Sequence, residues 1–406
     1  MDFRLSCEQA LLRYRVREYA STVLSPHVRA LEEQGEFPGQ LVSELSRLGL
    51  VGILTARTYG GSAMGHLARL IAIEEVSKVY GSSGFFLQVA PIGIYILENF
   101  GSEALKERYL PSLCDGEMLI AIALTESRGG CDMGAIRTTA DVNGDEYILN
   151  GRKTMITLSP ICDLAIVVAR TGDGFSTFLL ERGMKGFETP RRENRSGFRS
   201  IPIGNITMTN CRVPKANLIG GEGRGVAAIM SGIGAVGRLG AAGVALGLAE
   251  GCYQDAMRYA AKRELYGKPI AELQTIQNML VDSSTDIETA RWLCYYAAWL
   301  LDQGKSPRDA ADEIARCKLY ACDIATRVAL RAIQILGGRG TIQEYGIARR
   351  LNDATELLAA AGTQEVMRNS IGRNIISRDV ASHAGSPPRA SGAMMLDLEP
   401  EALVRD

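Results

Sequence analysis

A short glycine-containing turn late in the chain carries residues suited to holding an anion or a polarised ring. Leu358–Arg368 reads LAAAGTQEVMR and joins two apolar, helix-like runs. Gly362 interrupts the apolar pattern, and Thr363 is placed to cap the helix that follows it. Because a helix N-terminus presents unpaired N–H groups and the positive end of the helix dipole, this turn is a candidate ligand cradle.

A second turn of this kind is Leu124–Asp132, which reads LTESRGGCD. Its glycines allow backbone N–H groups to approach a ligand closely. Residues 220–225 (GGEGRG) lack the spacing of a dinucleotide-binding turn and follow no parallel-strand unit, so we exclude a nicotinamide site there. The three histidines and nine cysteines form no metal-ligand cluster and no CxxC pair, so we expect no metal.

The overall charge and hydropathy of the chain exclude several classes of partner. The net charge is −1, which gives no electrostatic footprint for nucleic acid or for an anionic membrane. The N-terminus lacks the apolar core of a signal peptide, and no transmembrane helix is expected. Scattered cysteines without disulfide spacing fit a reducing compartment, so we expect a cytoplasmic protein.

The order of secondary-structure signals predicts a multidomain α+β protein. Residues 1–118 read as an N-terminal helical domain, and residues 119–225 read as a middle antiparallel β-barrel. Residues 226–380 return to long helical runs with short connections, which predicts an antiparallel four-helix bundle. Residues 381–406 are small and polar with two prolines, which is typical of a disordered tail.

Two local patterns support this division. Residues 141–151 contain two Asn-Gly pairs, at 143–144 and 150–151, which indicate hairpin turns in the middle domain. The helical run from Met230 to Arg263 is rich in glycine, although each interior glycine costs a helix about 1 kcal/mol relative to alanine. Such a pattern indicates close approach of a neighbouring helix or of a ligand, and helix packing explains most of it.

Four phrases, together with the order of domains, resemble the acyl-CoA dehydrogenase family of FAD enzymes over roughly residues 8–378. They are LTESRGGCD at 124–132, GRKTMIT at 151–157, KRELYGKPI at 262–270 and QILGGRG at 334–340. Ser127 stands where the family usually has Pro, Cys131 where it has a flavin-binding Ser, and Met155 where it has an aromatic residue. The resemblance implies the family fold, bound FAD, and a homotetramer or homodimer in which some FAD contacts come from a neighbouring subunit.

Carried over position by position, the resemblance assigns FAD contacts along the whole chain. The expected cofactor-binding residues are Leu124, Thr125, Gly130, Cys131, Met155, Thr157, Arg263, Tyr266, Gln274, Gln334, Gly337, Gly338, Thr363 and Glu365.

The same resemblance identifies the catalytic positions and a departure from the family pattern. The family usually reads Tyr-Glu-Gly-Thr where this chain reads Ala360-Ala361-Gly362-Thr363, and that Glu removes the substrate α-proton. Some members place the base on another helix, at the position of Gly237, next to the substrate-facing Arg238. Neither position carries a carboxylate here, although the backbone N–H of residue 361 remains available to hold the substrate carbonyl.

Four hypotheses follow from a missing base. The α-carbanion arises by decarboxylation of a β-keto acid or malonyl-type group, with hydride transfer to flavin and optional oxygenation by O2, as in a natural-product pathway. Alternatively, a relocated base serves an ordinary acyl-CoA or acyl-carrier-protein dehydrogenase, or the protein is a flavin monooxygenase, or it is an inert acyl-binding scaffold. Candidate relocated bases are Glu344, Asp353, Glu356 and Glu365.

Overall fold

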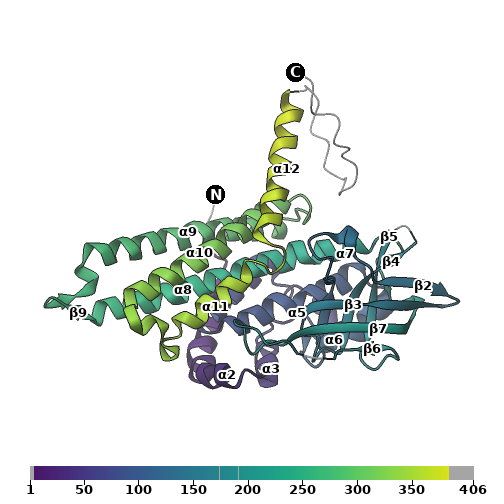
Figure 1. Cartoon of the computed structure of the whole chain (residues 1–406), viewed down its shortest axis with the longest axis horizontal. Coiled ribbons are helices and arrows are strands. Elements are labelled where there is room, and N and C mark those ends of the chain that lie inside the picture. Colours follow the sequence, from purple (N-terminus) through teal and green to yellow (C-terminus); the bar gives the residue numbers. More distant parts are fainter. Residues whose placement is uncertain (1–3, 173, 191, 384–406) are drawn as a thin grey trace.

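The computed structural model describes residues 4–172, 174–190 and 192–383. The chain forms an N-terminal group of helices, a sheet and a C-terminal helical bundle, with the sheet at one end of the molecule and the bundle at the other (Figure 1). The N-terminal helices are α1 (Cys7–Tyr19), α2 (Val28–Gln34), α3 (Gly39–Arg47), α4 (Gly65–Val79), α5 (Gly81–Phe100) and α6 (Glu103–Cys114).

The middle region is a single eight-stranded sheet in the order β6-β7-β3-β2-β4-β5-β8, with β1 also pairing with β4. Its strands are β1 (Ile120–Ala123), β2 (Thr139–Asn143), β3 (Glu146–Thr157), β4 (Leu164–Thr171), β5 (Gly174–Glu181), β6 (Phe187–Glu188), β7 (Ile203–Pro214) and β8 (Leu218–Ile219). Alternate residues of β4 enter two different cores. Ile166 and Val168 pack towards the helices, while Val167 and Ala169 pack within the β domain.

The prediction of a purely antiparallel sheet is wrong in one respect, because β4 pairs parallel with both β1 and β2. Two paired strands that are joined by a tight turn must run antiparallel. Strand β4 is not joined to β1 or to β2 by such a turn, so it can pair with each of them in parallel. The first Asn-Gly pair does form the predicted turn between β2 and β3. The second, Asn150-Gly151, instead lies inside β3 at a shift in register with β7, with φ +154° at Gly151.

The C-terminal region contains the glycine-rich helix and the helices that pack around it. Its elements are α7 (Gly225–Gly232), a π-helical turn (Ile233–Arg238), α8 (Leu239–Lys262), the small strands β9 (Glu264–Leu265) and β10 (Lys268–Pro269), α9 (Gln274–Asp302), α10 (Ala311–Leu336), α11 (Ile347–Leu357) and α12 (Gln364–His383). Helix α10 packs against α8, α9, α11 and α12. Helix α12 reaches His383, three residues into the segment predicted to be a tail, and 384–406 lie outside the described residues.

The glycines of α8 are explained by its close packing against α4, as the sequence indicated. A Cβ at Gly240 would lie 2.7 Å from an Arg69 nitrogen, and one at Gly247 would lie 2.5 Å from the backbone oxygen of Glu74. By length and composition the continuous helix Gly225–Lys262 is long and apolar enough to cross a membrane. It is instead a core helix, since 72% of its most apolar window is buried.

Candidate active site

A π-helical turn interrupts the glycine-rich helix at the point where the site lies. In the π-turn Ile233–Arg238 the ordinary i to i−4 hydrogen bonds are broken, which frees backbone carbonyls for other partners. Arg69 donates to the carbonyl of Val236 at 3.0 Å, and Gln88 donates to the carbonyl of Gly237 at 3.0 Å. Because both donors are buried, they fix the turn that carries Gly237 and Arg238.

The turn after α11 lies against this π-turn and adopts a strained backbone. Ala361 has φ +55° and Gly362 has φ +106°, so a residue with a Cβ is held in the left-handed region. Nε of Arg238 donates to the carbonyl of Ala361 at 3.3 Å, and Nζ of Lys318 donates to the carbonyl of Leu358 at 2.9 Å. Two cationic side chains from different helices therefore hold this turn in place.

Gly237 and Ala361 lie next to each other in the folded chain. A Cβ at Gly237 would lie 3.9 Å from the Cβ of Ala361, with Ile92 of α5 as its nearest neighbour at 3.2 Å. Gly234, one helical turn earlier, is buried, and a Cβ there would meet nothing within 4 Å. The structure thus brings together two positions that are 124 residues apart in the sequence, and neither bears a side chain that accepts a proton.

The electrostatic character of the region around these residues is positive. Burial lowers the pKa of Arg238. Burial also lowers the pKa of Lys318, the charge of Arg238 lowers it further, and the carboxylate of Glu365 opposes the shift. A carboxylate of a ligand would therefore find two cations near the turn at Ala361.

The loop Leu124–Asp132 packs against strand β3 and presents the other predicted residues. The backbone N–H of Thr154 donates to the carbonyl of Thr125 at 2.8 Å. A Cβ at Gly130 would lie 3.2 Å from Cγ2 of Thr125, so the loop is tightly turned. Met155, with φ +57°, leaves 60% of its surface exposed on the same strand as Thr157, and Cys131 is also exposed.

Glu126 fixes the conformation of this loop through its hydrogen bonds, a role that was not predicted from the sequence. Its carboxylate accepts hydrogen bonds from Nζ of Lys153 at 2.8 Å, from Oγ1 of Thr138 at 2.6 Å, and from the N–H groups of Thr138 and Arg137. Burial raises the pKa of Glu126, but these donors outweigh it and the net shift is downward. A charged residue next to a glycine-rich turn was the only signal in the sequence.

A second group of predicted cofactor residues lies at the far end of the helical bundle, near β9 (Figure 1). Its members are all exposed, and Tyr266 is 91% exposed. A Cβ at Gly337 or Gly338 would meet nothing within 4 Å, which leaves their backbone open to a ligand. The structure does not bring this group to Met155 within one chain. The group consists of Arg263, Tyr266, Gln274, Gln334, Gly337 and Gly338.

The acidic residues considered as relocated bases have other partners. Glu356 is bound by Arg195 and by the N–H of Gly197, and Asp353 accepts from the N–H of Phe198 at 2.5 Å. Burial raises the pKa of Asp353 to about 7. Glu344 lies 3.7 Å from Arg29 on a separate cavity. Glu365 is at the start of α12 beside Thr363, whose hydroxyl caps that helix through the N–H of Val366 at 3.4 Å.

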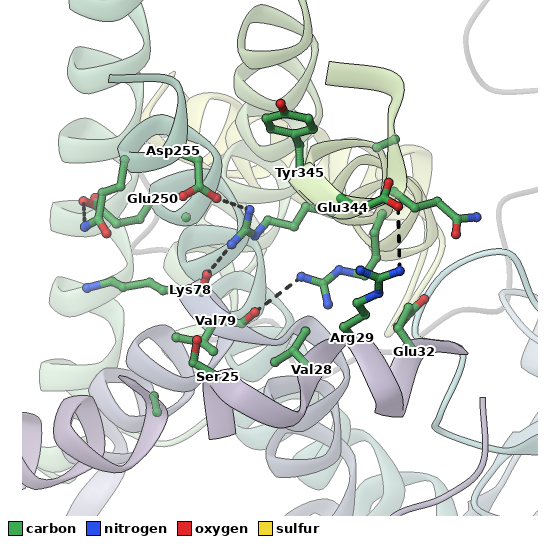
Figure 2. A pocket seen from close by; sticks show the side chains of 18 of the residues that line it. Ser25, Val28, Arg29, Glu32, Lys78, Val79, Glu250, Asp255, Glu344 and Tyr345 are labelled. Carbon is green, nitrogen blue, oxygen red and sulfur yellow. Dashed lines mark hydrogen bonds and ion pairs between the residues drawn. The ribbon is translucent and has the colours of Figure 1, made fainter. Parts of the chain in front are cut away.

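A separate cavity of about 1240 Å³ lies between the N-terminal helices and the C-terminal bundle. Figure 2 shows Arg29 and Glu32 of α2 on one side and Glu250 and Asp255 of α8 on another. Its lining contains neither Arg238 nor Ala361. This cavity is therefore distinct from the region between the π-turn and the turn after α11.

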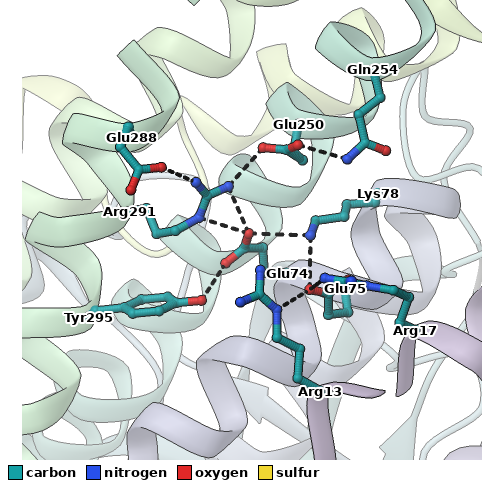
Figure 3. A network of polar contacts seen from close by, with 10 residues as sticks. All are labelled: Arg13, Arg17, Glu74, Glu75, Lys78, Glu250, Gln254, Glu288, Arg291 and Tyr295. Carbon is teal, nitrogen blue, oxygen red and sulfur yellow. Dashed lines mark hydrogen bonds and ion pairs between the residues drawn. The ribbon is translucent and has the colours of Figure 1, made fainter. Parts of the chain in front are cut away.

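A charged network that forms part of the wall of that cavity joins four helices (Figure 3). Arg291 of α9 contacts Glu74 of α4 at 3.0 Å and Glu250 of α8 at 2.8 Å. The neighbouring Glu75 accepts from Arg13 of α1 at 2.8 Å, from Arg17 and from Lys78 at 2.9 Å. Each buried carboxylate in the network has a cationic partner, so its role is to fix the helices. Among the described residues, no group of three His, Cys, Asp or Glu could hold a metal ion.

Comparison with known proteins identifies the family. Models of the acyl-CoA dehydrogenase N-terminal, middle and C-terminal domains match residues 6–117, 121–211 and 223–376. The chain is 35% identical over 374 residues to the short-chain-specific acyl-CoA dehydrogenase of Clostridium acetobutylicum, covering 91% of this chain and 98% of that protein.

Solved structures agree with this assignment. Butyryl-CoA dehydrogenase from Megasphaera elsdenii is similar with a TM-score of 0.89 at 33% identity, covering 93% of this chain and 100% of that one. PigA with FAD and proline gives a TM-score of 0.89 at 29% identity, with the same coverage. Met155 is exposed on the strand that carries Thr157, and the backbone at Gly337 and Gly338 is open, so both segments are accessible to a ligand. The chain belongs to the acyl-CoA dehydrogenase family and is an FAD-dependent oxidoreductase.

Proposed function

We propose that this enzyme oxidises an acyl substrate between Cα and Cβ after decarboxylation, without a carboxylate base. The observation that carries the proposal is the pair Gly237 and Ala361. These residues lie next to each other, and they occupy the two positions at which the family resemblance places the base. The substrate is a malonyl-type thioester or a β-keto acid, carried by CoA, by a carrier protein or by neither.

Loss of carbon dioxide replaces the step that normally needs a base. The bond between Cα and the carboxylate carbon breaks, and its electron pair stays on Cα as an enolate next to the carbonyl. When bound, FAD accepts the hydride that leaves Cβ. One carboxylated substrate thus gives one enoyl or enone product, one carbon dioxide and one reduced flavin, with no proton removed from carbon.

The residues around the site suit a reaction in which the protein holds the substrate carbonyl and provides no base. The N–H of Ala361 lies in the turn held by Arg238 and Lys318 and is free to hold the substrate carbonyl as negative charge develops on its oxygen. Of the acids nearby in sequence, Glu356 pairs with Arg195, and one oxygen of Asp353 accepts from the N–H of Phe198. These contacts favour decarboxylation over an ordinary dehydrogenase that has relocated its base.

The separation of the two groups of cofactor residues supports a homodimer or homotetramer. Arg263 and Tyr266 are exposed at one end of the bundle, whereas Met155 lies on the sheet at the other end (Figure 1). In the proposed assembly, the first two residues contact the FAD held at Met155 of a neighbouring copy.

Restoring the base tests the proposal. The variant Ala361→Glu is mixed anaerobically with butyryl-CoA, which has no carboxylate to lose, and flavin bleaching is followed. We expect the wild-type enzyme to bleach slowly and the variant to gain on the order of 10²–10⁴-fold, the usual contribution of a positioned base. Ala360→Glu adds the same charge one residue away and is the control. Rapid bleaching of the wild-type enzyme by butyryl-CoA would overturn the proposal, because a base would then be present.

A further inference from the structure

Arg238 has no carboxylate partner within the described residues, whereas two other arginines in the helical core are ion-paired. Arg350 contacts Asp255 at 2.6 Å, and Arg291 contacts Glu74 and Glu250. Arg69 lacks a carboxylate but donates to the carbonyls of Val236, Leu87 and Gln88. Within the described residues, Arg238 has one hydrogen-bond acceptor, the carbonyl of Ala361, and no Asp or Glu forms an ion pair with it.

An unpaired guanidinium in this position is costly unless a ligand supplies the missing charge. Taking an arginine out of water is unfavourable, and the neighbouring Lys318 adds repulsion. The carboxylate of Glu365 acts on Lys318 but lies exposed at the start of α12. Within the described residues, the two cations beside the turn at Ala361 therefore have no buried carboxylate partner.

Small residues lie next to this guanidinium at the positions where a base would project. A Cβ at Gly362 would lie 3.9 Å from Nη2 of Arg238, and a Cβ at Gly237 would lie 3.9 Å from the Cβ of Ala361. Neither Gly237 nor Ala361 has a side chain that could supply a carboxylate to Arg238. A carboxylate of the substrate is then the group that could pair with this guanidinium.

We propose that Arg238 is the anchor for the substrate's own carboxylate, which lies between the π-turn and the turn at Ala361–Gly362. This inference rests on the proposed function and specifies its substrate class as an acyl group with a carboxylate on Cα. Guanidinium is the cation best matched to a carboxylate, because its planar donors bind two oxygens at once. Anchoring also selects the bond that breaks, since it fixes the carboxylate on the side of Cα that faces Ala361.

Equilibrium binding to the FAD-loaded enzyme tests the anchor without relying on turnover. Malonyl-CoA and acetyl-CoA differ only by the carboxylate, and neither can reduce the flavin, because neither carries a hydrogen on Cβ. We expect the wild-type enzyme to bind malonyl-CoA about tenfold more tightly than acetyl-CoA, or better, as measured by isothermal titration calorimetry. Arg238→Met should reduce this ratio to about one, and Arg238→Lys should restore part of it.

Two further variants make the test specific. Ala361→Glu should bring the ratio below one, because the new carboxylate pairs with Arg238 and repels that of the ligand. Arg212→Gln removes one exposed positive charge of the β domain, where Arg212 pairs with Glu146 at 3.1 Å, and should leave the ratio unchanged. Equal wild-type affinity for the two thioesters, or no binding of either at about 1 mM, would overturn the anchor.

The outcome separates this inference from the proposed function. Carbon dioxide release and flavin reduction that persist with an unchanged affinity ratio in Arg238→Met would refute the anchor and leave decarboxylative oxidation standing. A ratio that depends on Arg238 in an enzyme that releases no carbon dioxide from any carboxylated substrate would support the anchor and refute decarboxylation.

Discussion

Glu126 and Lys153 offer a sharp test of how the loop Leu124–Asp132, predicted to bind FAD, is held in place. Lys153 is fully buried, its Nζ lies 2.8 Å from Glu126, and it also donates to the carbonyl of Leu124 at 3.2 Å. In Glu126→Gln the lysine charge stays buried without its carboxylate. Removing one partner of a buried pair costs about 3–5 kcal/mol, so we expect a loss of that size in the stability of the β domain.

Removing both charges should cost much less than removing one. In the double variant Glu126→Gln and Lys153→Met, no buried charge is left unpaired, and the glutamine oxygen still accepts from Thr138. We therefore expect the double variant to recover more than half of the single-variant loss. Glu146→Gln removes an exposed partner of Arg212 in the same domain and should change stability by less than about 1 kcal/mol.

The temperature at which FAD is released reports on this loop directly, because flavin fluorescence rises when the cofactor leaves. For a domain of about 100 residues, a loss of about 3–5 kcal/mol corresponds to roughly 12–40 °C. Release from Glu126→Gln within about 1 °C of the wild-type temperature would refute the reasoning. So would a double variant that releases FAD at a lower temperature than the single variant.

Two further predictions concern the helical frame. Gly247→Ala should destabilise the protein by about 1–3 kcal/mol in urea unfolding, because the new Cβ meets the backbone of Glu74 at 2.5 Å. The control is Gly372→Ala, where a Cβ meets nothing within 4 Å, and it should stabilise α12 slightly. Burial raises the pKa of Glu75, but Arg17, Lys78 and Arg13 outweigh it and lower it to about 2. The contribution of the charged Glu75 to the free energy of unfolding is therefore complete above about pH 4.5 and is lost as the pH falls towards 2. In Glu75→Gln, we expect the free energy of unfolding to change less with pH over this range.

Periodicity and turn residues were sufficient to predict the order of elements. The helices around Leu12 and Leu45, the hairpin at Asn143-Gly144 and the long glycine-rich helix all follow from local sequence. The parallel pairing of β4 could not be predicted, because strand direction depends on which strands meet and not on the residues within them. The prediction of a second turn at Asn150-Gly151 was wrong, because a glycine allows a bulge within a strand as readily as a turn between strands.

For the candidate site, too, single residues could be predicted from the sequence, but their contacts could not. Family resemblance pointed to Arg238 and Ala361 separately, but their contact joins segments 123 residues apart and is visible only in the folded chain. The roles of Glu126 and Lys318 were missed because a single charged residue in a sequence does not reveal its partner. That no carboxylate of the described residues pairs with Arg238 is a property of the packed site, and no local pattern encodes it.

The most direct test of the central claim is a single-turnover experiment under anaerobic conditions that measures flavin bleaching and carbon dioxide release together. The FAD-loaded enzyme is mixed with ethylmalonyl-CoA labelled in the free carboxylate, and with butyryl-CoA, which has the same acyl chain without that group. The account predicts that the carboxylated thioester alone bleaches the flavin, with one labelled carbon dioxide released for each flavin reduced. Bleaching by butyryl-CoA at the same rate, or bleaching without labelled carbon dioxide, would contradict it.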